Sequence, residues 1–297
     1  MIDRADHLRH EPQSLTALWP RARVLLLDAS GRAASEHDGS LLAPLGAEVT
    51  SGGPGGVGAA VFLGLDPDGA GWFALDADLS AFVAPRWTDL RAAAAHWPPL
   101  HASVFAQARA LQHWRARNRF CGVCGGAVGM SRGGWLGTCG DCAAEHYPRT
   151  DPAVIVAVTD GSRLLLGRQS SWPARRYSVL AGFVEPGESL EQTVAREVLE
   201  ETRVRVRHCR YLASQPWPFP GALMLGFVAI AEPDEPQVGE ELEEARWFSA
   251  DDLRAAQRRE TLPHSGDDGG PLLSSPISIS RWLIEQWLQD ADGPPPG

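Results

Sequence analysis

Two closely spaced pairs of cysteines constrain this chain more than any other feature of its sequence. Cys121 and Cys124 form one Cys-x-x-Cys pair, Cys139 and Cys142 form the other, and fourteen residues separate the two pairs. Four thiolates on two tight turns suit a closed tetrahedral zinc site better than they suit redox-active pairs. We therefore predict one structural zinc ion in a small ribbon, because a site filled by four sulfurs leaves no position for a reacting water.

The length of the chain, 297 residues, favours more than one domain, because a single hydrophobic core usually stops growing before that size. Short apolar runs with glycine-rich breaks such as 51–58 predict a strand-rich α+β domain before the cysteines. Alternating apolar segments after Tyr147 predict an α/β domain, and consecutive prolines predict a disordered tail. The predicted domains are 1–115, the ribbon 116–149, the α/β domain 150–290, and the tail 291–297.

Hydrophobic periodicity places the individual elements. Period-two runs predict strands, and spacings of three and four predict helices. The predicted strands are 23–28, 59–65, 71–75, 153–158, 163–166, 177–184, 204–213, 222–231 and 245–248. The predicted helices are 89–96, 102–119, 189–202 and 277–288.

Charge and hydropathy exclude several partners. The net charge of −10 argues against broad, salt-driven attachment to nucleic acid or to an anionic membrane surface. No run of 18 or more apolar residues is present, and the N-terminus is charged where a secretory signal would need an apolar stretch. We expect a cytoplasmic protein without membrane contact, where reduced thiols persist. An acidic protein that handles phosphates would need metal ions locally.

Three glutamates gather on one predicted helix. Glu197 and Glu201 stand one turn apart, with Glu200 beside them, while apolar residues recur every four positions over 190–198. Stacked like charges destabilise an isolated helix by about 0.2 to 0.5 kcal/mol per pair, so a cation is expected there. Carboxylate clusters suit Mg²⁺ or Mn²⁺, which bind alongside substrate phosphates. The alternative is a solvated acidic face whose glutamates pair with Arg196.

The segment 182–204 resembles the Nudix box, in which a glycine, a glutamate and an Arg-Glu-x-x-Glu-Glu run stand at fixed spacing. One position departs from this pattern, because Arg203 stands where the box has its second glycine. That glycine ends the helix in a left-handed conformation, so arginine there should cost on the order of 1 kcal/mol without removing a metal ligand. The matching positions are Gly182, Glu188, Arg196, Glu197, Val198, Glu200, Glu201 and Val204.

A proline-rich segment, Ser-Gln-Pro-Trp-Pro-Phe-Pro over 214–220, narrows the resemblance. Its prolines stiffen a loop that presents Trp217 and Phe219 as flat surfaces for a nucleotide base, although a plain turn between strands is the alternative. Ribbon, Nudix box and this motif, in this order, resemble the NADH pyrophosphatase family over about residues 115–290. The implied fold is an α/β/α Nudix sandwich preceded by the zinc ribbon and a strand-rich α+β domain.

The resemblance implies an activity and partners. It implies cleavage of the pyrophosphate bond of NADH or NAD⁺ to AMP and nicotinamide mononucleotide, with preference for the reduced form. Related dinucleotides and the NAD caps of RNA 5′ ends are further candidate substrates, and the chain is expected to form a homodimer with a shared site. The alternative from another class is a nucleotide or RNA sensor on a Nudix scaffold, which Arg203 favours and the retained glutamates oppose.

Roles for single residues follow from the resemblance. Glu197, Glu200 and Glu201 are the implied catalytic residues, and which carboxylate orients the water stays open, the run 240–244 included. Glu188 is expected to pair with Arg196 and fix the loop to the helix. The implied Mg²⁺ or Mn²⁺ ligands are Ala181, through its carbonyl, Glu197, Glu201 and Glu241, with Glu240 and Glu244 as alternatives to Glu241. The implied substrate contacts are Tyr147, Phe183, Gln215, Pro216, Trp217, Pro218, Phe219, Pro220, Gly221, Ala222 and Ser280.

Overall fold

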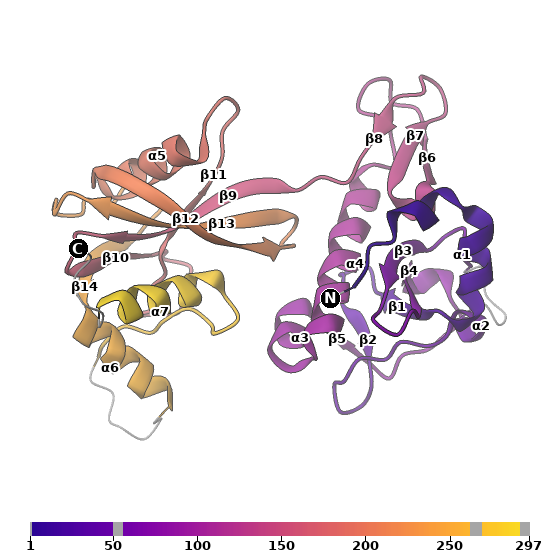
Figure 1. The fold of residues 1–297 in the computed structure, drawn as a ribbon, viewed down its shortest axis with the longest axis horizontal. Coiled ribbons are helices and arrows are strands. Elements are labelled where there is room, and N and C mark those ends of the chain that lie inside the picture. The colour runs from indigo at the N-terminus through magenta and orange to yellow at the C-terminus, as the bar shows by residue number, and fades with distance from the viewer. Residues whose placement is uncertain (1, 50–55, 262–268, 292–297) are drawn as a thin grey trace. The chain divides into compact units, whose positions relative to one another are not determined.

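The computed structural model describes residues 2–49, 56–261 and 269–291. The predicted tail, apart from Ala291, and most of the predicted glycine-rich break lie outside the described residues. Contacts divide the chain into two compact units (Figure 1), and each is described by itself. The first unit comprises residues 1–150 with 217–221, and the second comprises 151–216 with 222–297. No helix in the described part of the chain is long and apolar enough to cross a membrane.

The first unit is built on a five-stranded sheet of order β3-β4-β1-β2-β5. The strand β1 runs parallel to β4, and the other neighbours are antiparallel. Alternate residues of β1 enter two cores, with Leu25 and Leu27 on one face and Val24 and Leu26 on the other. The strands are β1 (Arg23–Leu27), β2 (Ala33–Ser35), β3 (Val61–Leu65), β4 (Gly71–Asp76) and β5 (Arg86–Thr88).

Two helices, α3 and α4, cover one face of this sheet. The helix α3 begins after Asp89, whose carboxylate accepts hydrogen bonds from the backbone N–H groups of Arg91 and Ala92. The helix α4 packs Val104, Phe105, Ala108 and Leu111 into the same core. It starts three residues before the predicted 102, because Pro99 suits the first turn of a helix. The helices of this unit are α1 (Pro12–Leu18), α2 (Gly46–Val49), α3 (Leu90–His96) and α4 (Pro99–Arg117), with 3-10 turns η1 (Asp6–His10), η2 (Trp19–Arg21) and η3 (Ala77–Leu79).

The cysteine segment forms a small antiparallel sheet in the order β6-β7-β8. A hydrogen bond ties this ribbon to the first sheet, since the indole N–H of Trp135 donates to the carbonyl of Phe62 at 2.7 Å. The elements are β6 (Val128–Ser131), η4 (Arg132–Gly134), β7 (Leu136–Cys139) and β8 (Glu145–His146).

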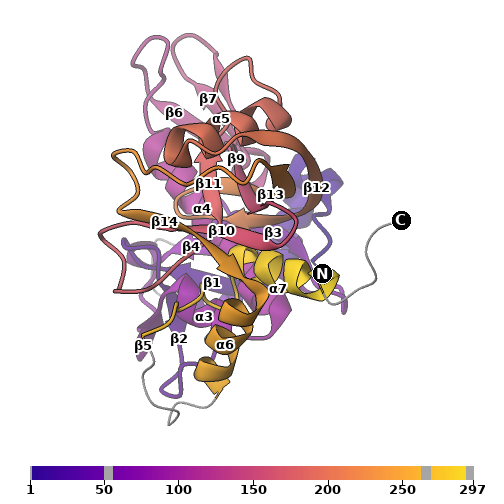
Figure 2. The ribbon, with the colours of Figure 1, turned by 90° about the vertical axis from the view of Figure 1, so that its left-hand side faces the viewer.

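The second unit is an α/β/α sandwich, as predicted (Figures 1 and 2). Its mixed sheet has the order β12-β13-β9-β10-β14, with β11 paired to β9 and β13 parallel to β9. The helix α5 covers one face, and α6 and α7 cover the other. The elements are β9 (Asp151–Thr159), β10 (Arg163–Arg168), β11 (Leu180–Phe183), α5 (Leu190–Thr202), β12 (Val206–Trp217), β13 (Ala222–Ala231), β14 (Glu244–Ser249), α6 (Ala250–Thr261) and α7 (Ile279–Ala291).

Three elements of this unit differ from the sequence prediction. The strand β11 is shorter than 177–184, and β12 continues past 213 into the proline-rich motif. The helix α6 was not predicted at all. It begins with a reciprocal pair in which Ser249 and Asp252 bond each other's backbone N–H, and Leu253 and Ala256 anchor it to the core. Leu253 and Ala256, three residues apart, are the apolar signal in the sequence from which this helix could have been predicted.

Candidate functional site

The helix α5 carries the glutamates, and its start is fixed by a capping box. The Ser189 hydroxyl accepts from the backbone N–H of Gln192 at 3.3 Å, and the Gln192 side chain accepts from the N–H of Ser189 at 2.8 Å. Val194 and Val198 are fully buried against the sheet. These contacts set the rotation of the helix, so that Glu197 stands on the side toward β11. The Ser-x-x-Gln spacing of residues 189–192 is the signal in the sequence from which this cap could have been predicted.

Arg196 ties the helix to the loop before it. Its guanidinium donates to Glu188 at 2.6 and 2.9 Å and to the carbonyl of Phe183 at 2.9 Å. This confirms the predicted pairing of Glu188 with Arg196. Hydrogen bonds from Arg196, with others from the N–H of Glu185 and the hydroxyl of Thr193, lower the pKa of Glu188 to about 2. Glu188 is therefore ionised and serves to hold the loop rather than to transfer protons.

The backbone of β11 supports the Glu197 carboxylate directly. A Cβ atom placed on Gly182 would lie 1.8 Å from the Cδ atom of Glu197, so only glycine leaves room for this contact. Arg196 also donates to Glu197 at 2.9 Å. Ala181, whose carbonyl is a predicted metal ligand, immediately precedes Gly182 in β11.

Glu201 is the most buried of the acidic side chains in this group. It is 8% exposed, and its Oε2 atom has no hydrogen-bond partner among the described residues. Burial, followed by the charges of Glu197 and Glu241, raises the pKa of Glu201 to about 8. A buried carboxylate with an unpaired oxygen is costly in a protein unless a cation compensates it.

Glu241 belongs to the same electrostatic group. It raises the pKa of Glu201, and it also contributes to the raised pKa of Glu197, for which burial is the largest cause and which Arg196 opposes. Glu244, an alternative from the same run, instead accepts a hydrogen bond from the hydroxyl of Tyr177. The donor set is all oxygen and negatively charged, which fits a hard divalent cation.

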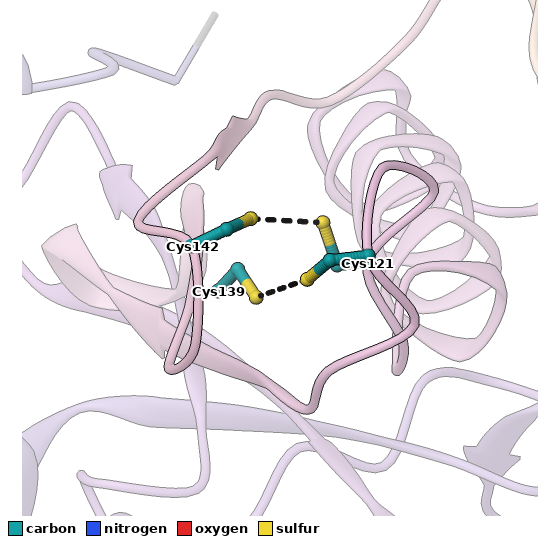
Figure 3. Close-up of side chains that lie close together, drawn as sticks. Cys121, Cys139 and Cys142 are labelled. Carbon is teal, nitrogen blue, oxygen red and sulfur yellow. Dashed lines mark hydrogen bonds between the residues drawn. The ribbon is translucent and has the colours of Figure 1, made fainter.

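The four cysteines come together in the ribbon. The sulfurs of Cys121 and Cys142 lie 3.7 Å apart and face each other (Figure 3), and those of Cys124 and Cys139 lie 3.4 Å apart. Zinc–sulfur bonds of about 2.3 Å in a tetrahedron put sulfurs roughly 3.8 Å apart, so the set fits zinc. Backbone N–H groups of Cys142 and Asp141 lower the pKa of Cys139 to about 7.

The cysteines and the glutamates differ in how closely they gather. We compared groups of three or more His, Cys, Asp or Glu side chains. Within the described ranges, the four cysteines are the only such group whose ligand atoms all lie within 4.8 Å of one another. The ligand atoms of the described glutamates do not form such a group, and carboxylates that lie close together repel one another. The ribbon is therefore a preformed metal site.

Two of the four predicted aromatic contacts are exposed. Tyr147 follows β8 in the first unit and is 56% exposed, and Phe183 ends β11 in the second unit and is 59% exposed. Trp217 and Phe219 meet edge to face, with ring centroids 5.0 Å apart. Tyr147 and Phe183 are open to a ligand. Phe219 instead packs against the core of the first unit, with the guanidinium of Arg91 4.0 Å from its ring centroid. The contact of these rings with substrate stays a prediction.

Two of the predicted substrate contacts have structural tasks. The Gln215 amide donates to the carbonyl of Ile277 and accepts from the N–H of Ile279, both at 2.8 Å, so it holds the start of α7. Ser280 is only 2% exposed, and its hydroxyl lies 2.8 Å from that of Ser178. Both side chains position α7 against the strands, and a direct contact with substrate stays a prediction.

Comparison with family models defines the class of protein. The model of the NUDIX domain matches residues 149–265, which hold the glutamates. A model described as the NADH pyrophosphatase-like rudimentary NUDIX domain matches residues 15–114. The NADH pyrophosphatase zinc ribbon domain matches residues 116–147. The fold and the site are those of a zinc-ribbon Nudix hydrolase.

Relatives that match most of the chain identify the family within this class. A Mycobacterium bovis protein named NAD-capped RNA hydrolase NudC is 39% identical over 292 residues, covering 96% of this chain and 92% of the relative. A protein of the same name from Stutzerimonas stutzeri is 41% identical, covering 77% of each chain. The crystal structure of a NUDIX hydrolase from Nitrosomonas europaea is 27% identical with a TM-score of 0.40, covering 52% of this chain and 96% of that one. The chain belongs to the NADH pyrophosphatase family of Nudix hydrolases, as predicted from its sequence.

Proposed function

We propose that this enzyme hydrolyses the pyrophosphate bond of NADH and NAD⁺ to AMP and nicotinamide mononucleotide, and that it removes NAD caps from RNA 5′ ends. The observation that carries the proposal is the buried Glu201 of the Nudix box, whose Oε2 atom has no hydrogen-bond partner among the described residues. Its pKa is raised by burial and by the charges of Glu197, in the same box, and Glu241, outside it. The names of the relatives support NAD-capped RNA as a substrate. Related dinucleotides are further candidates.

The glutamates would hold Mg²⁺ or Mn²⁺, together with the carbonyl of Ala181. Such an ion neutralises phosphoryl charge and lowers the pKa of a bound water. Burial suits Glu201 to the role of ligand, and Gly182 supports Glu197 in the same role. Glu200 is largely exposed while bonded to Arg196 at 3.0 Å, so it is the carboxylate best placed to orient an incoming water.

The enzyme would act as a homodimer with a shared nucleotide site. Tyr147 and Phe183 are both more than half exposed, and each offers an open face to a base. One chain would supply one of these faces and its partner the other. The cytoplasm is the compartment that fits, because zinc thiolates must stay reduced.

Incubation with NADH and Mg²⁺ or Mn²⁺ tests the proposed reaction. Release of AMP that a chelator stops, and that Mg²⁺ without added zinc restores, supports the enzyme. Tight binding of NADH without product would instead support the sensor. Competition between NADH and NAD-capped RNA then gives the ratio of kcat/KM for the two substrates, which decides which one the site prefers.

A further inference from the structure

One long stretch of this acidic protein contains basic residues and no acidic ones. The whole chain has a net charge of −10. It contains 27 arginines and no lysine. Residues 90–140 contain six of these arginines and neither aspartate nor glutamate. They are Arg91, Arg109, Arg115, Arg117, Arg119 and Arg132. A segregated patch of this kind attracts anions even when the protein as a whole repels them.

Part of this stretch lines a groove in the first unit. Arg109, Gln112, His113, Ala116 and Arg119 recur at spacings of three and four, so they share one side of α4 and its C-terminal end. The groove has a volume of about 850 Å³. Its other wall comes from the turn residues Ala29, Ser30 and Gly31 and from Val128 and Met130 of β6.

The arginines at the end of α4 are free to meet a ligand. Arg117 and Arg119 are exposed, and neither makes an ion pair with any described residue. Burial, followed by the charges of Arg117 and Arg109, lowers the pKa of His113, so the potential on this side of α4 is positive. An anion in the groove would relieve that repulsion.

Two carboxylates also line the groove. Asp76 accepts a hydrogen bond from Gln112 at 2.7 Å, and the nearby charge of Arg115 offsets its own. Asp78 is exposed at the groove. Asp78 therefore opposes the two remaining arginines of the lining, Arg109 and Arg119, and its substitution tests which ligand lies there.

An aromatic ring completes the surface. Phe120 directly follows Arg119, lines the same groove and is 65% exposed. Surfaces that bind single-stranded nucleic acid combine cations that follow the backbone with aromatic faces on which bases stack. Arginine suits this task because its planar group both pairs with phosphate and stacks.

We propose that this groove binds the single-stranded RNA chain that follows the cap, with Arg119 on a phosphate and Phe120 on a base, and with Arg117, outside the groove lining, on a neighbouring phosphate. The inference rests on the proposed removal of NAD caps. It gives the first unit a task that NADH alone does not require. Pro220, a predicted nucleotide contact, also lines the groove. Substitution of Arg117, Arg119 or Phe120 should nevertheless leave hydrolysis of free NADH unchanged and raise the KM for capped RNA.

The first test measures RNA affinity against salt. The probe is a 5′-monophosphate RNA single strand of about 12 nucleotides, which contains no bond for the enzyme to cut. The double variant Arg117→Gln/Arg119→Gln should weaken binding about 10-fold and reduce the slope of log K against log salt by roughly 1.4, at about 0.7 per phosphate contact. The matched control is Arg205→Gln/Arg207→Gln, which removes the same charge from arginines already paired with Asp234 and Glu232.

Two further variants test the position of the RNA. Phe120→Ala should weaken binding roughly 5-fold or more, and Phe120→Tyr should restore it. Zinc content must stay at wild-type level, because Phe120 adjoins Cys121. Asp78→Asn should strengthen binding by roughly 2- to 5-fold, a gain that damage to the fold would not produce.

The outcomes separate this inference from the proposed function. If the wild-type enzyme cleaves NADH and capped RNA, but the Arg117/Arg119 variant and its control bind RNA alike, the groove is not the RNA site. An unchanged affinity in both the Phe120→Ala and the Asp78→Asn variants would overturn it as well. If the wild-type protein cleaves neither substrate, the proposed function itself fails.

Discussion

The carboxyl group of Glu197 packs on Gly182, where a Cβ atom would come within 1.8 Å of the glutamate Cδ. Gly182, the first glycine of the Nudix box, therefore leaves the space that Glu197 occupies, fifteen residues further along the chain. It lets a charged side chain of α5 lie against the backbone of β11. The carboxylate is positioned by the strand as well as by its own helix.

Gly182→Ala should displace Glu197 and weaken metal binding while leaving the sheet intact. A misplacement of about 1 Å at a catalytic group costs on the order of 100-fold in rate. Titration of activity with Mg²⁺ would measure both effects. Gly58→Ala is the matched control, since a Cβ there meets nothing within 4 Å. Equal kinetics for the two variants would show that the contact with Glu197 is unimportant.

Glu201→Gln should leave the fold intact and lower turnover by several orders of magnitude, because it keeps the size of the side chain and removes the charge that a metal needs. Stopped assays of AMP release with saturating Mg²⁺ would measure the loss. Circular dichroism serves as the control for folding. Near-normal rates under these conditions would rule out Glu201 as a ligand.

The pH dependence of stability should report on Glu201 directly. Its pKa is raised from 4.5 to about 8, so between these values the folded state holds a proton that the unfolded chain releases. Without divalent metal, stability is therefore greatest at the acid end of this window and falls as the pH rises through it. The Tm of Glu201→Gln should fall less over the same window. Identical pH profiles of Tm for the two proteins would contradict the assignment.

Cys121→Ser or Cys139→Ser should release zinc and lower the Tm, while any protein that stays folded still hydrolyses NADH. The reason is that four sulfurs close the coordination shell. Zinc content by mass spectrometry and residual activity per folded molecule are the two measurements. Cys209→Ser, outside the ribbon, is the control and should keep its zinc. Loss of activity with an unchanged melting curve would mean that the zinc is not structural.

Tyr147→Ala should weaken NADH affinity roughly 10- to 100-fold, because a stacked base is worth about 1 to 3 kcal/mol. Mixing Tyr147→Ala chains with Glu201→Gln chains is the sharper measurement. If the site is shared between chains, each heterodimer contains one site with both defects and one with neither, so activity returns. The absence of recovery, or a mass measurement of an active monomer, would refute the shared site.

Features that depend on neighbours in the chain could be predicted from the sequence. The cysteine spacing indicated the ribbon, and the period of Val194 and Val198 indicated α5, because turns and helices form from residues a few positions apart. The pairing of Glu188 with Arg196 followed from the Nudix pattern. Arg203 adopts the left-handed conformation with φ of 60°, so the backbone at that position keeps the form that the missing glycine would have taken.

Only the tertiary structure decided which acidic side chains lie close enough to shift one another's pKa. The burial of Glu201, its unpaired oxygen, the effect of Glu241 on its pKa and the hydrogen bond from Tyr177 to Glu244 all depend on contacts between elements that are tens of residues apart. Gln215 likewise turned out to hold the start of α7. Local sequence sets helix faces and turns, but desolvation and charge coupling arise when distant elements pack, and these determine the chemistry of a carboxylate.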